Sequence, residues 1–298
     1  MSQQKSRFLP TFLLLFVAVI WGSTFAIMKN SLNRINVDSF LAWRFILAAI
    51  LMAIVRPKSI RLITPNFLMK GVVLGLFLGG GYIFQTFGLT LTTVAKTGFV
   101  TGLYAIFVPL IAAGFFKEVV TKLQWFAVTL AVIGMAILSL KGLSIGLGEF
   151  LVLVCALLFA CHIIGLSYWS PGRDAYALTM IQMATVGVLS LISTARTGFQ
   201  TPHDHGVWIA IFYCAIFASA FAFIIQTWAQ SFMSATGVGI VLTMEYIFAA
   251  IFGILLVHER LTWRTVVGGL CVMTRLYVVM LVDSREKIRE KIREKIES

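Results

Sequence analysis

The chain has 298 residues, of which 59% are hydrophobic and 12% are charged, and it carries a formal net charge of +12. Soluble domains are about half apolar and about a quarter charged, so this composition excludes an ordinary soluble protein and indicates a membrane protein. The basic residues are scattered over short loops and do not gather on one amphipathic face, which argues against nucleic acid as a partner. The expected surroundings are a lipid bilayer.

Ten apolar runs are long enough to cross a bilayer as helices, which takes about 20 residues each. The sequence therefore predicts an all-α membrane protein with ten transmembrane helices, near residues 12–28, 38–55, 67–90, 94–116, 123–140, 146–168, 175–195, 207–229, 235–257 and 263–282. With a cytoplasmic N-terminus, the inside segments carry 15 Lys and Arg residues and the outside segments carry 7. Because basic residues are enriched on the cytoplasmic side, we expect both termini there.

The first two predicted spans carry polar and aromatic residues within apolar surroundings. Trp21 is compatible with an anchor at the membrane interface or, together with Ser23 and Thr24, with the wall of a cavity. Arg44 lies about six residues into the second span, where its side chain is long enough to snorkel to the outer surface. A functional role for Arg44 is equally compatible with this position.

Glycines recur at four-residue spacing in the third and fourth predicted spans, as Gly71, Gly75 and Gly79 and then as Gly98 and Gly102. Small residues on one face let helix backbones approach closely in lipid, so these glycines predict helix packing. Pro109 predicts a kink in the fourth span, because proline removes a backbone donor and clashes with the preceding turn.

Isolated histidines mark the second half. His162 sits on an apolar helix, where we expect a structural histidine whose ring is hydrogen-bonded. His203 and His205 flank Asp204 in a predicted outside loop. The pattern resembles a weak metal site, but a solvated loop is the preferred interpretation, and we expect neither a metal nor a cofactor.

The stretch Gln85–Thr121 recurs 141 positions later as Gln226–Thr262, with eight identities in 37 gap-free pairs. Roughly three identities would arise by chance in so apolar a chain. The repeat predicts two five-helix halves, residues 1–141 and 142–283, and five crossings per half require the second half to be inverted relative to the first. Residues 284–298 form a regular, charged helical tail that looks like an added extension.

The repeat also shows a difference, because Glu245 stands where the first copy has Tyr104. A carboxylate within the membrane is expensive, so Glu245 is a candidate functional residue. Arg275 in the tenth span lies at a similar depth, since both residues are roughly 20 Å from the connecting turn. Either the two form an ion pair that locks their helices, or Glu245 faces a cavity, where it changes protonation or binds a cationic substrate.

Several short motifs carry a family resemblance: Trp21-Gly22-Ser23, Arg44-Phe45, Gln85-Thr86-x-Gly88-Leu89, Gly98-x-x-x-Gly102-Leu103, Val108-Pro109-Leu110, and an acidic residue after the fourth and ninth spans, Glu118 and Glu259. Together they resemble the EamA-like members of the drug/metabolite transporter superfamily over residues 10–282. The resemblance implies two inverted five-helix bundles, with a central substrate cavity formed by the first four helices of each half. Arg275 departs from this pattern, since it lies at the repeat position of Gly134 in a helix that should be peripheral.

In similar proteins the fifth and tenth helices often support dimerisation, so a homodimer is expected. The resemblance further implies transport of a small metabolite, amino acid or drug across the bacterial inner membrane, commonly outward as an exporter. The alternatives are a membrane-embedded enzyme and a channel or sensor. No clustered nucleophile or His/Asp/Glu motif supports the enzyme.

We therefore predict a secondary transporter that works by alternating access around a cavity lined by the first, third, fourth, sixth, eighth and ninth spans. The substrate-binding candidates are polar or aromatic residues of these spans: Trp21, Tyr82, Gln85, Tyr104, Gln226 and Glu245. The candidate coupling or buried charges are Glu245, Lys96, Arg44 and Arg275.

Overall fold

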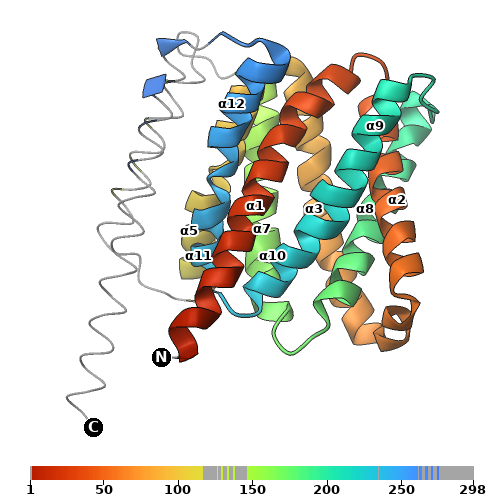
Figure 1. The fold of residues 1–298 in the computed structure, drawn as a ribbon, viewed down its shortest axis with the longest axis vertical. Helices are drawn as coiled ribbons and strands as arrows, with labels where there is room; N and C mark the ends of the chain where they lie inside the picture. Colours follow the sequence, from red (N-terminus) through yellow and green to blue (C-terminus); the bar gives the residue numbers. More distant parts are fainter. Residues whose placement is uncertain are drawn as a thin grey trace.

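The computed structural model describes residues 2–116, 146–233 and 235–260, and single residues between 126 and 137 and between 262 and 274. Within these ranges every regular element is a helix, and the long helices run side by side (Figure 1). Seven segments are long and apolar enough to cross a membrane: Leu9–Ser31, Val37–Val55, Pro65–Leu91, Val94–Gly114, Leu147–Trp169, Ala175–Thr197 and His205–Gln230. They coincide with the first four and the sixth to eighth predicted spans, so the all-α membrane architecture is confirmed for this part of the chain.

The remaining three predicted spans have different outcomes. The ninth, 235–257, is divided between α11 (Ala235–Leu242) and α12 (Glu245–Val257). The fifth and tenth, 123–140 and 263–282, fall outside the described residues apart from single positions. Ten helices in two inverted repeats therefore stay a prediction.

The first half contains α1 (Ser2–Ser31), α2 (Val37–Val55), the 3₁₀ helix η1 (Pro57–Leu62), α3 (Pro65–Leu91), α4 (Val94–Thr101) and α5 (Tyr104–Phe116). Polar side chains fix where these helices begin. Asn36 accepts a hydrogen bond from the Ser39 N–H at the start of α2, and Thr64 accepts one from the Phe67 N–H at the start of α3. Such caps satisfy backbone donors that have no partner within the helix.

The second half contains α7 (Leu147–Trp169), α8 (Ala175–Thr197), α9 (His205–Tyr213), the π-helix η2 (Cys214–Phe221), α10 (Ala222–Gln230), α11 and α12. Asp204 caps α9 by accepting a hydrogen bond from the Val207 N–H, and it also forms an ion pair of 2.7 Å with Arg34. The Val207 N–H bond, followed by the Arg34 contact, lowers the pKa of Asp204. The carboxylate between His203 and His205 thus caps α9, and His205, expected in a loop, is the first residue of that helix.

Two helix breaks show the internal repeat in the backbone. The bounds of α4 and α5 become those of α11 and α12 when 141 is added to each number. At the first break Leu103 N–H donates to the Val100 carbonyl, and at the second Met244 N–H donates to the Val241 carbonyl, so both breaks are tightened by three-residue bonds at repeat-related positions. The kink predicted at Pro109 stays a prediction, because Pro109 lies inside α5, and the helix assignment is interrupted earlier, at Gly102 and Leu103.

The predicted packing role of the glycines is confirmed by the geometry. Gly71, Gly75 and Gly79 of α3 face Ile181, Thr185 and Leu189 of α8, and an added Cβ would lie only 2.5 to 2.9 Å from these side chains. Gly98 of α4 meets Ala249 of α12 in the same way, at 2.7 Å. The helix backbones approach closely at these positions, as expected for packing in lipid.

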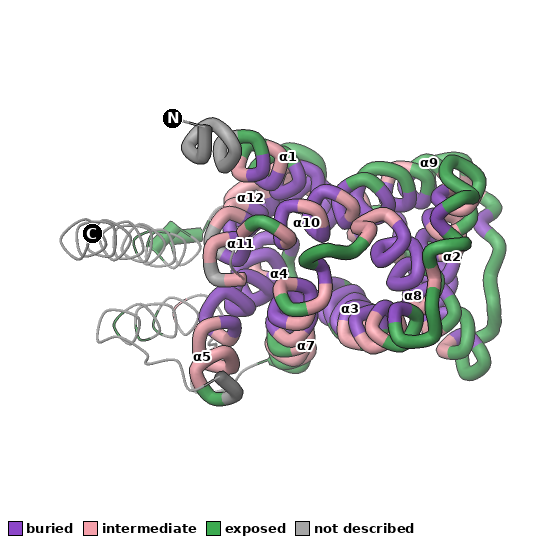
Figure 2. The backbone as a smooth tube through the Cα atoms, turned by 90° about the horizontal axis from the view of Figure 1, so that it is seen from below, coloured by how far each residue is buried: buried purple, intermediate pink, exposed green. Residues whose placement is uncertain are grey.

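The most extensive helix contacts join the two predicted halves. They are formed by α3 with α7, α2 with α8, and α1 with α12. Figure 2 shows that buried residues concentrate where the helices face one another, whereas exposed residues lie mainly on outer faces and in loops. The described helices therefore form one packed unit with an apolar outer surface for lipid.

Candidate central cavity

A cavity lies among α1, α3, α5, α7, α10, α11 and α12, and its wall is mostly aromatic and polar. The lining residues are Trp21, Thr24, Phe25, Leu78, Tyr82, Gln85, Tyr104, Phe159, His162, Ile163, Phe223, Gln226, Leu242 and Glu245. All six substrate-binding candidates are among them, and the lining residues as a whole come from the six spans expected to line a cavity. The structure brings these residues together, and their binding of a substrate stays a prediction.

The cavity is narrow in this conformation. Measured over the positions that the centre of a water molecule can take, its volume is about 30 Å³. One buried water needs roughly 10–15 Å³ on this measure, so the cavity holds a few water molecules. This volume is too small for a molecule of the size of an amino acid.

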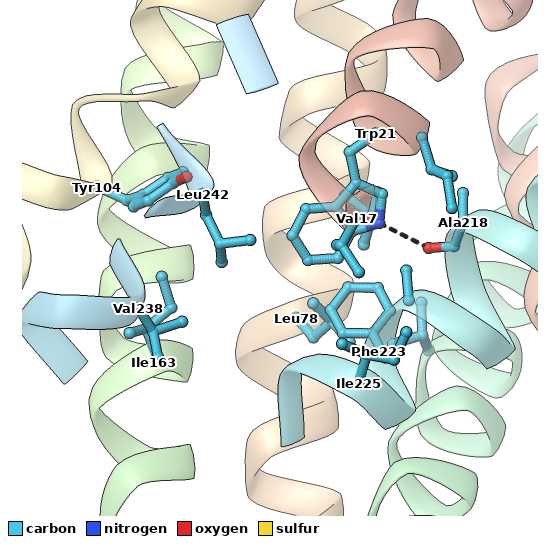
Figure 3. Close-up of a cluster of buried hydrophobic side chains, with 14 of the residues drawn as sticks. Val17, Trp21, Leu78, Tyr104, Ile163, Ala218, Phe223, Ile225, Val238 and Leu242 are labelled. Carbon is cyan, nitrogen blue, oxygen red and sulfur yellow. Dashed lines mark hydrogen bonds between the residues drawn. The ribbon is translucent and has the colours of Figure 1, made fainter. Parts of the chain in front are cut away.

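Trp21 is fixed in the cavity wall by its indole group. Its Nε1–H donates a 2.8 Å hydrogen bond to the Ala218 carbonyl, and its ring centroid lies 5.0 Å from that of Phe223 (Figure 3). The interfacial-anchor interpretation of Trp21 is therefore wrong. Thr24 also lines the cavity, whereas Ser23 turns to the Tyr213 hydroxyl, 2.8 Å away. The Ala218 carbonyl belongs to η2, and π-helical turns are frequent at functional sites.

Arg44 is fully buried behind Tyr82, so the snorkelling interpretation is wrong. Its Nε–H donates to the Ser219 hydroxyl at 2.8 Å, and its guanidinium carbon lies 4.6 Å from the centroid of the Tyr82 ring. Ser219 and two aromatic rings, those of Phe45 and Tyr82, give the cation favourable contacts inside the bundle. None of the ion pairs found between described residues involves Arg44.

Glu245 and Gln226 present hydrogen-bond acceptors to the cavity. Glu245 is the first residue of α12, where the helix dipole favours a negative charge, and it is 7% exposed. Within the described ranges its carboxylate forms no hydrogen bond or ion pair. Gln226 donates from Nε2 to Gln230 at 3.0 Å, while its buried Oε1 accepts nothing from the described residues. Two acceptor groups of the cavity thus receive no hydrogen bond from the described residues.

His162 is a cavity residue that the sequence analysis did not assign to the site. Its Nε2 is 2.7 Å from Gln182 Oε1, which confirms the hydrogen-bonded ring expected for a structural histidine. The same residue lines the cavity together with Phe159 and Ile163 of α7. Their spacing of three and four residues places all three on one helix face, and this periodicity is the signal that identifies them.

The sequence is similar to those of known transporters. The sequence profile of the EamA-like transporter family matches residues 9–140 and again residues 146–281. The chain belongs to the EamA-like transporter family. This EamA-like protein is 29% identical over 269 residues to an uncharacterized transporter of Archaeoglobus fulgidus, covering 90% of this chain and 84% of the relative.

Other similarities agree with this membership. The uncharacterized transporter YoaV of Bacillus subtilis is 22% identical over 293 residues, covering 91% of this chain and 97% of YoaV. One solved crystal structure superposes with a TM-score of 0.71 at 15% identity, covering 92% of this chain and 98% of the other, which concerns the fold alone. The EamA-like protein is therefore a multi-pass membrane transporter, and family membership speaks against the enzyme alternative.

Lys96 of the EamA-like protein lies apart from the central cavity. Because α4 begins at Val94, Lys96 belongs to its first turn, and its Nζ forms a 2.8 Å ion pair with Glu149. Lys96, Glu149 and Lys29 line a separate cavity of about 540 Å³ at this end of the bundle. Lys96, a candidate coupling or buried charge, therefore does not line the central cavity, and a coupling role for it stays a prediction.

A neighbouring contact closes the same end. Glu259 follows α12 and accepts hydrogen bonds from two backbone groups at the start of α4, Val94 N–H at 2.6 Å and Ala95 N–H at 3.2 Å. This contact links the two halves of the EamA-like protein. Arg275 and Glu118 fall outside the described residues, so the pairing of Glu245 with Arg275 stays a prediction.

Proposed function

We propose that this EamA-like protein is a secondary transporter of the bacterial inner membrane that exports a small metabolite, amino acid or drug. The observation that carries this proposal is the central cavity, because it combines aromatic walls with unpartnered acceptors at the junction of the two halves. Substrate sites of secondary transporters lie near the midplane at such junctions. Both termini are proposed to be cytoplasmic, with a homodimer formed through the fifth and tenth spans.

The chemistry of the cavity favours a substrate that carries a protonated amine or another organic cation. Glu245 offers a carboxylate, and Gln226 offers an amide oxygen, and both are acceptors for N–H donors. The rings of Trp21, Tyr82 and Phe223 surround the same space. Aromatic faces attract cations by about 2 kcal/mol or more where water is excluded, so the walls and the carboxylate favour the same charge.

Alternating access is supported by the closed geometry and by the matched helix breaks. The cavity must widen to accept a substrate, and the breaks at Gly102–Leu103 and at Thr243–Met244 lie directly beside the lining residues Tyr104 and Glu245. Short stretches of three-residue hydrogen bonding within a helix often mark hinges. The proposed movement swings α4 and α11 in turn, each opening one end of the cavity.

Counterflow in proteoliposomes tests the proposal. Vesicles loaded with an unlabelled organic amine should transiently accumulate the same labelled compound, and saturating external amine should suppress the signal. Glu245→Gln should lose this exchange while keeping its folded yield, whereas Asp204→Asn, a matched acid-to-amide change at an exposed loop, should keep it. Exchange of uncharged or anionic solutes alone would exclude the cationic substrate. An enzyme would show no exchange, and a channel would show no saturable counterflow.

A further inference from the structure

An apolar groove of about 680 Å³ runs along the outside of the bundle, between α2, α3 and α8. Aliphatic side chains dominate its wall, and several of them are strongly exposed, including Ile50 at 50%, Val188 at 55% and Ile192 at 65%. Along α8 the lining extends from Met180 to Ile192, which corresponds to roughly 18 Å of helix. The groove is separate from the central cavity, since the two share no lining residue.

One end of this groove is closed by η1, which places basic residues beside apolar ones. In a 3₁₀ helix residues three apart share a face. Ile60 of η1 and Ile63, the residue that follows η1, both line the groove. Lys58 and Arg61 share the adjacent face and are exposed. The groove thus ends at a pair of exposed cations.

These two cations are available to a ligand. Arg56, the nearest basic residue before η1, is already paired with Asp174 at 2.9 Å. Neither Lys58 nor Arg61 takes part in the ion pairs formed within the described part of the chain. An occupant with a hydrocarbon chain and an anionic head would match both the groove and its end.

We propose that this groove is a binding site for an anionic phospholipid, with one acyl chain between α2, α3 and α8 and its phosphate at Lys58 and Arg61. With both termini cytoplasmic, η1 lies at the cytoplasmic leaflet, where anionic lipids give a negative surface potential. A second copy of the chain fits this face poorly. A two-fold axis along the membrane normal would bring Lys58 and Arg61 of both copies to one level, where like charges repel.

The test is native mass spectrometry of the delipidated full-length protein, titrated with phosphatidylglycerol and with phosphatidylcholine of identical acyl chains. Each basic residue near an anionic surface contributes roughly fivefold to binding. Lys58→Gln/Arg61→Gln should therefore weaken phosphatidylglycerol binding by about 25-fold, and phosphatidylcholine binding much less, because the choline cation offsets its phosphate charge. Both residues are exposed, so the variant should fold.

A second variant tests the acyl-chain part of the site. Ala184 is exposed and lines the groove, so Ala184→Trp should fill it and weaken the binding of both lipids. Leu157→Trp, on an exposed face of α7 outside the groove, is the control for bulk, and Arg196→Gln, near the other end of α8, is the control for charge. Both controls should bind lipid as the parent protein does.

Three results would overturn the proposal. Equal binding of the two lipids by the parent protein would remove the headgroup preference, and unchanged phosphatidylglycerol binding by the Lys58/Arg61 variant would place the phosphate elsewhere. Conversion of a lipid-free dimer to a monomer by Ala184→Trp would assign the groove to a second copy of the chain.

Discussion

Replacing Glu259 with alanine tests whether its contact with α4 controls access to the cavity. The first three backbone N–H groups of α4 have no partner within the helix. Glu259 accepts from Val94 and Ala95, and the Thr93 hydroxyl accepts from Lys96. Removing the carboxylate therefore leaves two donors without a partner and raises the free energy of the closed state. The free energy of the open state changes little, because water reaches the two donors there.

The expected magnitude follows from these two bonds. A hydrogen bond to a charged group contributes about 1.5–3 kcal/mol net of hydration, and of the two bonds to Glu259 the one from Val94, at 2.6 Å, is the shorter. An anion at a helix N-terminus adds about 0.3–1 kcal/mol. A net bias of about 2 kcal/mol toward the closed state corresponds to a population ratio of about 30.

The assay is labelling of a single cysteine at position 24, in the cavity wall, after replacement of Cys155, Cys161, Cys214 and Cys271. A membrane-impermeant thiol reagent applied from outside should react about 10 to 30 times faster in Glu259→Ala. Glu259→Gln, which keeps one acceptor oxygen, should be intermediate. An unchanged rate from outside would refute the role of Glu259 in closing this end, and an increase only from the cytoplasmic side would reverse the proposed orientation.

Three further predictions concern Glu245, the glycine contacts and the turn after α12. Glu245→Gln should abolish transport at every pH while the protein stays folded. If the variant instead fails to fold and Arg275→Leu partly restores folding, Glu245 and Arg275 form a structural ion pair. Gly98→Leu should lower the folded yield, because its Cβ would lie 2.7 Å from Ala249 and overpacking costs about 1–3 kcal/mol. Gly114→Leu, whose Cβ would have no atom of the described residues within 4 Å, should not lower it, and equal yields would contradict the packing role. His258 has a left-handed backbone with φ 55°, so His258→Gly should raise the free energy of unfolding by about 1 kcal/mol in denaturant titration, and a decrease would mean that the His258 side chain stabilises the turn.

Much of the cavity could be predicted from sequence because polar residues in apolar runs stand out. Gln85, Gln226 and Glu245 are costly to bury in lipid, so they mark faces that turn inward. The 141-residue repeat indicated that Tyr104 and Glu245 occupy related positions, and the structure places both at the first residue after a helix break. Sequence order and composition were sufficient for these features.

Other features depend on contacts between distant helices. The position of Arg44 along α2 gave its distance from the helix end, but its burial is decided by Ser219 and Tyr82, which come from other spans. An added Cβ on Gly102 would collide with the ring of Tyr246, which comes from a distant span, and Pro109 lies inside α5. The π-helix η2 contains no glycine or proline from which a change in helix type could be predicted.

The number of residues in η2 determines which face of α10 lines the cavity. Phe223 and Gln226 are three residues apart, so they share the face that lines the cavity. Successive residues of an α-helix are turned by about 100°, and removal of one residue from Cys214–Phe221 would rotate everything after it by that angle. A single-residue deletion would therefore change which side chains of α10 line the cavity, without any substitution in α10 itself. A relative whose segment is one residue longer or shorter here would line the cavity with different α10 side chains, even if its α10 sequence were similar.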